Sequence, residues 1–431
     1  MSGMHAAKTL NRCLLIEYQT PSAMEKSNCK TSLPFALLIV LMLSAIIPIN
    51  SWSQQSPSPV NPDLDDFFTN LMDKYKFVGV GACLIKDDRI VWRGNYGYAN
   101  METGKMINDE SIFQISSISK TVTAVALLKL YEEGKLDLDE SIDPYLQFKF
   151  RNPYFPEKQI TFRMLLNHTS GLADVTSTGP VVPSKVGRPK SSRGDSEMTL
   201  EDYITQLLIP GGRYYSEEYF KNSEPGTSYN YSNIGYSLLG YLVQRISGMD
   251  FSDYCLKNIF DPLDMNDTRW HLRDLDTSRV IYSYSFSPED TVPVYRKTYH
   301  FGEPGYPAGM VRTTMDDFSR FLIMIMNRGM YGEVQLLKPS TIDIMLSPQH
   351  VPGMSSRSFK LIDKSLCWLM IETNGSLYYE MNGFSGSIFT DAHFSTENDT
   401  GMIYYLSGLN MKNMAAVAEI VDTLDQALKS Y

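Results

Sequence analysis

The chain has 431 residues, of which 43% are hydrophobic, so it is long enough to bury a large core. Its formal net charge of −10 argues against the basic surfaces that nucleic-acid-binding proteins need, and we expect no nucleic-acid partner. Its 5 cysteines are widely spaced and match neither a disulfide framework nor a metal-ligand pattern. We therefore expect no metal ion and no other cofactor.

An apolar run near the N-terminus has the composition of a secretory signal peptide. It extends from Leu33 to Ile49 and follows the basic residues Lys26 and Lys30. The run is short for a membrane-spanning helix, so we expect export and removal of residues 1–53, with Met24 as a possible start. The expected location is the periplasm or the outside of the cell. An uncleaved segment, which would tether the protein to a membrane, is the alternative.

The folded part of the chain is expected to span residues 64–431, after a linker over residues 54–63 that is rich in Ser, Pro and Gln. The elements predicted outside the helical middle of this part are a helix over 64–75, hairpin strands over 78–85 and 90–98, strands between 365 and 405, and a helix over 414–428. Terminal strands around a helical middle favour an antiparallel sheet covered by helices, with an inserted helical lobe.

Ser117 and Lys120 lie where a long, nearly apolar helix is expected to begin. Side chains three positions apart on a helix share one face, so the Lys120 amine can reach the Ser117 hydroxyl. A neutral serine is a poor nucleophile and needs a neighbouring base to take its proton. The partial positive charge of a helix N-terminus also favours a developing oxyanion. The pattern therefore indicates acyl transfer, whereas a solvated helix start is the alternative reading.

A second motif, Tyr231-Ser232-Asn233, precedes a predicted helix over residues 234–246. A phenol at a helix start near a lysine can have a lowered pKa and act as a general base or proton shuttle. The Asn233 amide can both donate to and accept from a substrate that contains an amide. The alternative is an aromatic-rich turn in a chain that is rich in tyrosine.

With the two motifs in this order, the chain resembles the serine β-lactamase and D,D-peptidase superfamily, and within it the class C branch with its esterase and aminopeptidase relatives. The resemblance covers residues 77–409. Further matching segments are residues 79–82, 134–140, 160–172 and 307–317. The resemblance implies an α+β fold with an antiparallel sheet flanked by helices, an all-helical lobe, and an active site in the cleft between them.

The same resemblance implies a role for each residue of the two motifs. Ser117 is expected to be the nucleophile and Lys120 its activating base. Tyr231 is then the second proton-transfer group, and Asn233 contacts the substrate. The implied activity is that of a secreted serine hydrolase that acts through a covalent acyl-enzyme on an ester, amide or β-lactam bond. Its partner is a small-molecule or peptide substrate.

The family's third motif, Lys-x-Gly or His-x-Gly on a strand beside the site, is altered in this chain. Its cation positions a substrate carboxylate, and the residue after its glycine supplies an oxyanion N–H. An alignment on Gly386 puts Phe384 at the cation position, and an alignment on Gly383 puts Met381 there. We prefer the alignment on Gly386, because its flanking residues also fit the family.

The preferred alignment assigns a substrate-binding and oxyanion stretch. Its members are Phe384, Ser385, Gly386 and Ser387. Backbone donors do not depend on the side chain, so the N–H groups of Ser117 and Ser387 are expected to form the oxyanion hole. The missing cation weakens the case for carboxylate-bearing substrates and leaves a second hypothesis, a catalytically silent binding protein that keeps the fold.

Two further features remain open from the sequence. His168 lies in a segment that resembles the family's histidine-threonine-serine-glycine stretch, and a structural role is expected for it. Residues 176–197 form a loop rich in Gly, Pro and Ser that carries Lys185 and Arg188. We interpret the loop as a solvated insertion. The alternative is a gate that supplies the cation missing from the third motif.

Overall fold

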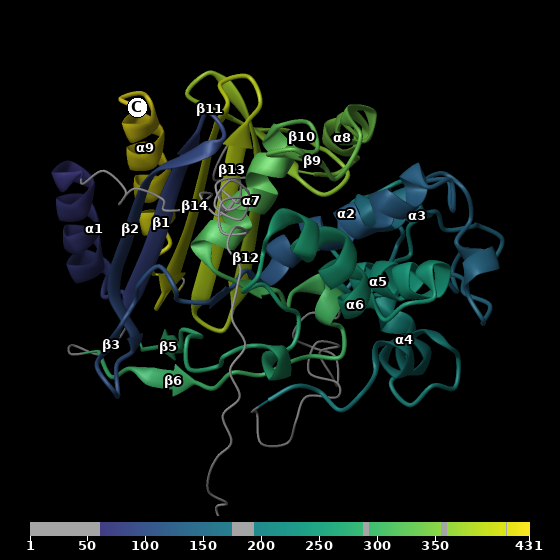
Figure 1. Ribbon diagram of the computed structural model, residues 1–431. Helices are drawn as coiled ribbons and strands as arrows, with labels where there is room; N and C mark the ends of the chain where they lie inside the picture. Colours follow the sequence, from purple (N-terminus) through teal and green to yellow (C-terminus); the bar gives the residue numbers. More distant parts are fainter. Residues whose placement is uncertain (1–60, 175–193, 288–292, 355–359, 411) are drawn as a thin grey trace, which may run out of the picture. The chain divides into compact units, whose positions relative to one another are not determined.

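An antiparallel sheet of eight strands, in the order β10-β11-β12-β13-β14-β1-β2-β3, organises the described part of the chain (Figure 1). The computed structural model describes residues 61–174, 194–287, 293–354, 360–410 and 412–431, within one compact unit of residues 57–431. The strands of this sheet are β1 (Gly79–Lys86), β2 (Arg89–Asn100), β3 (Lys105–Met106), β10 (Lys360–Lys364), β11 (Leu369–Thr373), β12 (Ser376–Ser385), β13 (Ile388–Ser395) and β14 (Thr400–Ser407).

The first strand of the chain, β1, pairs with the last, β14, inside the open sheet. β1 pairs with β2 through a tight turn at Asp87 and Asp88, whose φ angles are 48° and 65°. Two consecutive positive φ angles suit the right-handed twist of a hairpin. The other edge of β1 pairs with β14. The predicted hairpin is therefore confirmed, and it lies toward the β3 edge of the sheet.

Helices α1 (Pro62–Tyr75) and α9 (Ala415–Leu428) cover one face of the sheet (Figure 1). Their buried apolar residues form one cluster with residues of β1 and β14. Glu419 joins the two helices, because it accepts hydrogen bonds from Lys74 at 2.7 Å and from Tyr75 at 2.5 Å. Both terminal helices predicted from the sequence are therefore present at this face.

The opposite face packs against α7 (Met315–Met326) and leads into a helical region (Figure 1). The other helices on this side are α2 (Ser119–Glu132), α3 (Phe162–Leu166), α4 (Leu200–Leu208), α5 (Asn233–Ser247), α6 (Phe251–Cys255) and α8 (Pro339–Leu346). Short strand pairs accompany them: β4 (Phe113–Gln114) with β7 (Arg312–Thr313), β5 (Ser283–Ser285) with β6 (Arg296–Thr298), and β8 (Met330–Tyr331) with β9 (Val334–Gln335).

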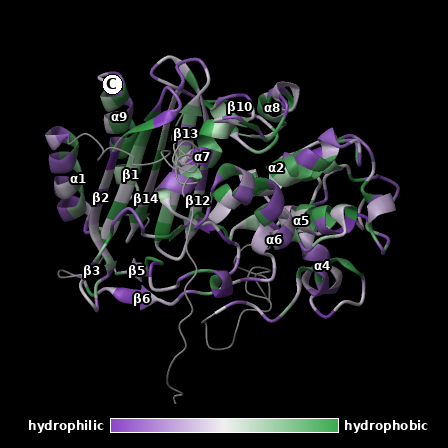
Figure 2. Ribbon diagram, in the orientation of Figure 1, coloured by the Kyte–Doolittle hydropathy of each residue, from purple (hydrophilic) through white to green (hydrophobic). Residues whose placement is uncertain are grey.

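Two helices fix the position of the functional motifs. α2 is buried on nearly all sides and packs against α5, and Figure 2 colours it largely as hydrophobic. α5 ends before Gly248, whose φ of 71° gives a left-handed C-cap.

The structure confirms the predicted α+β architecture. Among the described residues, no helix combines the length and apolar character that a membrane span requires. The predicted signal segment lies outside those residues.

Candidate active site

The turn that carries Ser117 lies where the sheet meets the helical region. It is a 3-10 turn, η1 (Ser116–Ile118), that runs directly into α2 and contacts β12. Ser116 has a φ of 49°, a left-handed conformation that costs a non-glycine residue about 1–3 kcal/mol and often accompanies functional sites. The sequence predicted a regular helix at Ser117, whereas the structure has a tighter turn there. The three-residue spacing still brings Lys120 to Ser117.

Lys120 is fully buried, and its Nζ lies 3.2 Å from Ser117 Oγ. Two oxygen acceptors, Asn233 Oδ1 and the Ala308 carbonyl oxygen, each lie 2.6 Å from the same Nζ. Burial lowers the pKa of Lys120 to about 7, although nearby carboxylates act in the opposite direction. A neutral amine has two hydrogens and one lone pair. The two acceptors bind the hydrogens, so the lone pair is free to take the Ser117 proton.

Tyr231 approaches Ser117 from the start of α5. Its hydroxyl donates to Ser117 Oγ at 2.7 Å. Desolvation raises the pKa of the Tyr231 phenol, and the hydrogen bond to Ser117 offsets only part of this effect. The phenol is therefore protonated at neutral pH. The sequence-based expectation of a lowered pKa is wrong, because a phenol whose hydroxyl end is desolvated resists ionisation. Tyr231 is suited to give a proton rather than to take one.

The His168 ring packs against the Tyr231 ring. The ring centroids of the two residues lie 4.6 Å apart, and the His168 ring also lies 5.0 Å from that of Tyr236. His168 Nδ1 accepts a hydrogen bond from the backbone N–H of Ser232 at 3.2 Å. Burial lowers the pKa of His168 well below its usual value, so the ring stays neutral. These contacts agree with the structural role expected for His168.

Asp174 is a site residue that sequence analysis missed. It accepts hydrogen bonds from Asn233 N at 2.9 Å, from Asn233 Nδ2 at 2.5 Å and from Ile234 N at 3.3 Å. The carboxylate thus caps the N-terminus of α5 and orients the Asn233 amide toward Lys120. Asn233 keeps one Nδ2 hydrogen for a substrate. The only signal for Asp174 was its position just after the segment that contains His168.

Gly383 is the point at which β12 meets the nucleophile turn. A Cβ atom at this position would lie 2.5 Å from the Ile115 carbonyl oxygen and 2.7 Å from Ser117 N, so the close approach requires glycine. Gly386, in contrast, occupies the exposed turn between β12 and β13 with a φ of 64°, and its nearest side-chain neighbour is Ser283.

These contacts correct the preferred alignment of the third motif. The Ser387 N–H donates to Ser283 Oγ at 2.9 Å, so it is not available to an oxyanion at Ser117. The alignment on Gly383 fits instead and puts Met381 at the cation position. The backbone N–H after that glycine belongs to Phe384, whose side chain is 55% exposed. Ser385 follows as the last residue of β12.

A buried lysine near the site was also missed. Lys364, at the end of β10, is only 2% exposed, and besides Lys120 it is the only lysine buried among the described residues. Burial lowers the pKa of Lys364 to about 8, and the charge of Lys120 lowers it further. Its own charge lowers the pKa of His168. The gate hypothesis for Lys185 and Arg188 falls outside the described residues.

Comparison with known proteins finds a match to a protein family and matches to curated relatives. The sequence model of the family described as Beta-lactamase matches residues 64–423. Penicillin-binding protein 4* of Bacillus subtilis (strain 168) is 31% identical over 55% of this chain and 47% of that protein. The human mitochondrial serine beta-lactamase-like protein LACTB is 28% identical over 50% of this chain and 49% of that protein. The chain spans about half the length of these relatives.

A solved structure with the same fold is D-amino acid amidase from Ochrobactrum anthropi SV3 complexed with D-phenylalanine. The TM-score is 0.66 at 21% sequence identity, and the match covers 85% of this chain and 99% of the amidase. At this identity the likeness shows the fold alone.

Proposed function

The chain belongs to the Beta-lactamase family of serine hydrolases, and we propose that it hydrolyses an ester, amide or β-lactam bond through an acyl-enzyme on Ser117. One observation carries the proposal. Ser117 Oγ lies between a base and an acid, 3.2 Å from Lys120 Nζ and 2.7 Å from the Tyr231 hydroxyl. A nucleophile in contact with both groups has the partners that acyl transfer requires.

In the acylation step, the Ser117 proton passes to neutral Lys120 while Ser117 Oγ attacks the substrate carbonyl carbon. The backbone N–H groups of Ser117 and Phe384 stabilise the resulting oxyanion. The carbon–nitrogen or carbon–oxygen bond then breaks, and the leaving group takes the Tyr231 proton. Tyr231 recovers a proton from the Lys120 ammonium. A water molecule then attacks the acyl ester, with the same two groups moving its protons, and releases the acid and free Ser117.

The altered third motif narrows the proposed substrate class. Met381 offers no charge to a substrate carboxylate, and we therefore place esters and amides without a terminal carboxylate ahead of β-lactam antibiotics. The name of one relative, a penicillin-binding protein, keeps the β-lactam bond within the proposed range. Export to the periplasm or the medium remains part of the proposal and rests on the apolar run from Leu33 to Ile49.

A covalent probe tests the assignment directly. The purified chain is treated with a fluorophosphonate, and intact mass is compared with that of the Ser117→Ala variant. The matched control is Ser340→Ala, which changes an exposed serine on α8. We expect one adduct on the wild-type chain and on the control, and none on Ser117→Ala.

A substrate panel then separates the classes. It compares a chromogenic cephalosporin, short-chain nitrophenyl esters and D-phenylalanine amide, each with the Ser117→Ala control. If the wild-type chain neither forms the adduct nor turns over any of these substrates, the proposal fails. Saturable binding without turnover would then favour the silent binding protein, for which the missing cation at position 381 is the supporting observation.

A further inference from the structure

The face of β12 that points away from the nucleophile turn carries a second buried polar cluster. We call Glu380, Asp391 and His393 the carboxylate–histidine cluster. These side chains are 2%, 2% and 5% exposed. Glu380 on β12 lies directly opposite His393 on β13. Asp391 precedes His393 by two residues on β13, so the two side chains lie on the same face of the sheet. One donor atom from each residue lies within 4.8 Å of the other two.

Each of the two carboxylates has one oxygen without a partner among the described residues. These atoms are Glu380 Oε2 and Asp391 Oδ1. The second oxygen of each carboxylate is held, because Asn382 Nδ2 donates to Glu380 Oε1 at 2.5 Å and the Tyr404 hydroxyl donates to Asp391 Oδ2 at 2.6 Å.

Two carboxylates buried side by side repel each other, and an unpaired buried polar atom is costly. His393 Nε2 lies 3.0 Å from Asp391 Oδ2 and can neutralise one of the two charges when it is protonated. It cannot at the same time neutralise Glu380. With both carboxylates ionised, the three residues therefore lack one positive charge, which the charge of Lys364 offsets only from outside the cluster. The two unpartnered oxygens mark where a cation would be bound.

We propose that the carboxylate–histidine cluster binds one divalent transition-metal ion of the zinc class. One imidazole nitrogen and two carboxylate oxygens are a ligand set that zinc accepts, whereas magnesium and calcium prefer oxygen alone. Bonds of about 2.0–2.2 Å to a tetrahedral ion place ligand atoms roughly 3.4 Å apart, so small side-chain rotations close the site. Asn382 and Tyr404 hold the ligating carboxylates in orientation.

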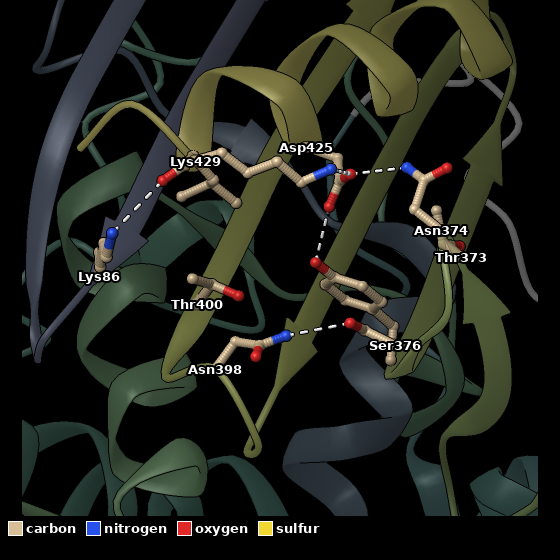
Figure 3. Close-up of a pocket in the computed structure, with 10 residues that line it drawn as sticks. Lys86, Thr373, Asn374, Ser376, Asn398, Thr400, Asp425 and Lys429 are labelled. Atoms are coloured by element: carbon tan, nitrogen blue, oxygen red, sulfur yellow. Dashed lines mark hydrogen bonds and ion pairs between the residues drawn. The ribbon is translucent and has the colours of Figure 1, made fainter.

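A pocket on the same face of the sheet lies near the cluster. It has a volume of about 370 Å³ and lies between α9 and the ends of the strands, where Asp425 receives hydrogen bonds from Asn374 and Lys429 (Figure 3). Tyr378, which donates to Asp425 at 2.7 Å, lines this pocket. Tyr378 precedes Glu380 by two positions and so lies on the same face of β12. Tyr378 therefore separates the pocket from the cluster by one side chain on that face, and an ion would enter past it.

The ion would join β12 to β13 behind the active site. Residues at alternate positions of a strand face opposite sides, so Gly383 contacts the nucleophile turn from the side that Glu380 does not use. A metal bond between the two strands would hold their register, and with it the position of Gly383 against Ser117. The ion would therefore have a structural role, and its binding can be measured without an activity assay.

The test measures metal binding by the whole chain, purified without a polyhistidine tag and stripped with a chelator. Co²⁺ is titrated while visible d–d absorption is recorded, and zinc per chain is measured by mass spectrometry after dialysis against ZnCl₂. We expect one ion per chain and a higher melting temperature with Zn²⁺. Glu380→Gln and His393→Gln keep side-chain volume, and each should weaken binding roughly a hundredfold or more, because a ligand is lost.

The matched control is His350→Gln, which removes an exposed histidine that lies 2.9 Å from Asp363. It should bind the metal as the wild-type chain does. Circular dichroism shows whether each variant folds. If the ligand variants unfold, anomalous diffraction from wild-type crystals soaked in ZnCl₂ decides, since it needs no substitution. A peak at the cluster supports the proposal. Substoichiometric binding, equal binding by all variants, or a peak elsewhere would overturn it and leave a proton-sharing network without metal.

Discussion

Two buried polar clusters lie on opposite sides of β12, and they differ in how their polar atoms are satisfied. In the first, the Lys120 amine has three oxygen neighbours within 3.2 Å, and Ser117 also accepts from Tyr231. In the carboxylate–histidine cluster, each carboxylate leaves one oxygen unpartnered among the described residues. The first arrangement is complete as it stands and directs a lone pair at Ser117. The second is complete only with an added cation.

Burial has different consequences for the charged groups on the two sides of β12. Desolvation lowers the pKa of Lys120 to about 7 and so makes it a base near neutral pH. The same low-dielectric environment makes paired carboxylates unfavourable unless they coordinate a positive charge. Substitutions at four positions test how burial acts on the groups around Ser117.

Replacing the buried amine should have the largest effect. In Lys120→Met the proton acceptor is lost, and we expect kcat/KM for a nitrophenyl ester to fall by about 10²–10⁴-fold. Lys120→Arg is the informative partner, because a guanidinium keeps the positive charge but cannot be deprotonated. It should be as inactive as Lys120→Met. An active Lys120→Arg enzyme would show that charge, and not basicity, is what Ser117 needs. Initial rates at substrate concentrations below KM provide the measurement.

Replacing Gly383, which contacts the nucleophile turn, should have the second largest effect on activity. In Gly383→Ala the new Cβ would lie 2.7 Å from Ser117 N, so either the strand or the turn must move. A displacement of about 1 Å at a catalytic group can cost about a hundredfold in rate, and we expect that loss in acylation by the fluorophosphonate. Gly386→Ala is the control. Its φ of 64° costs about 1–2 kcal/mol of stability, but it should label at the wild-type rate.

The reverse result, with slow labelling of Gly386→Ala and normal labelling of Gly383→Ala, would restore the alignment that the sequence favoured. From sequence alone the two glycines were equivalent, because both lie in the same stretch of the third motif. Only the contact of Gly383 with Ile115 and Ser117 distinguishes them. A local motif can therefore locate a strand beside the site without fixing which of its residues touches the nucleophile.

The contact between Ser117 and Lys120 was predicted from their spacing in the sequence. The two residues are three positions apart, and the turn η1 that leads into α2 brings their side chains together. The carboxylate–histidine cluster was missed because its members come together only through the pairing of β12 with β13. Asp174 was missed because its partner, Asn233, is 59 residues away. The direction of the Tyr231 pKa shift depends on desolvation, which a sequence does not specify.

Neutralising Asp174 should have a smaller effect, visible as a change in pH dependence. Activity requires neutral Lys120, so kcat/KM should rise with pH through the Lys120 pKa of about 7. The Asp174 charge raises that pKa, so in Asp174→Asn the rising limb should move to lower pH. Asp422→Asn, an exposed acid on α9, should leave the limb unchanged. A limb that stays fixed, or moves to higher pH, in Asp174→Asn would remove Lys120 as the titrating base.

The smallest effect is expected from the second buried lysine. If the Lys364 charge substitutes in part for the cation missing at position 381, Lys364→Met should raise KM for a carboxylate-bearing ester a few-fold relative to its neutral methyl ester, with kcat changing little. Lys360→Met is the matched control, since Lys360 lies on the same strand but is exposed and paired with Glu372 at 2.6 Å. An unchanged KM ratio would mean that Lys364 does not contact the substrate carboxylate. Lys364 would then act only on the polar groups buried beside it, among them Glu380, whose pKa its charge lowers.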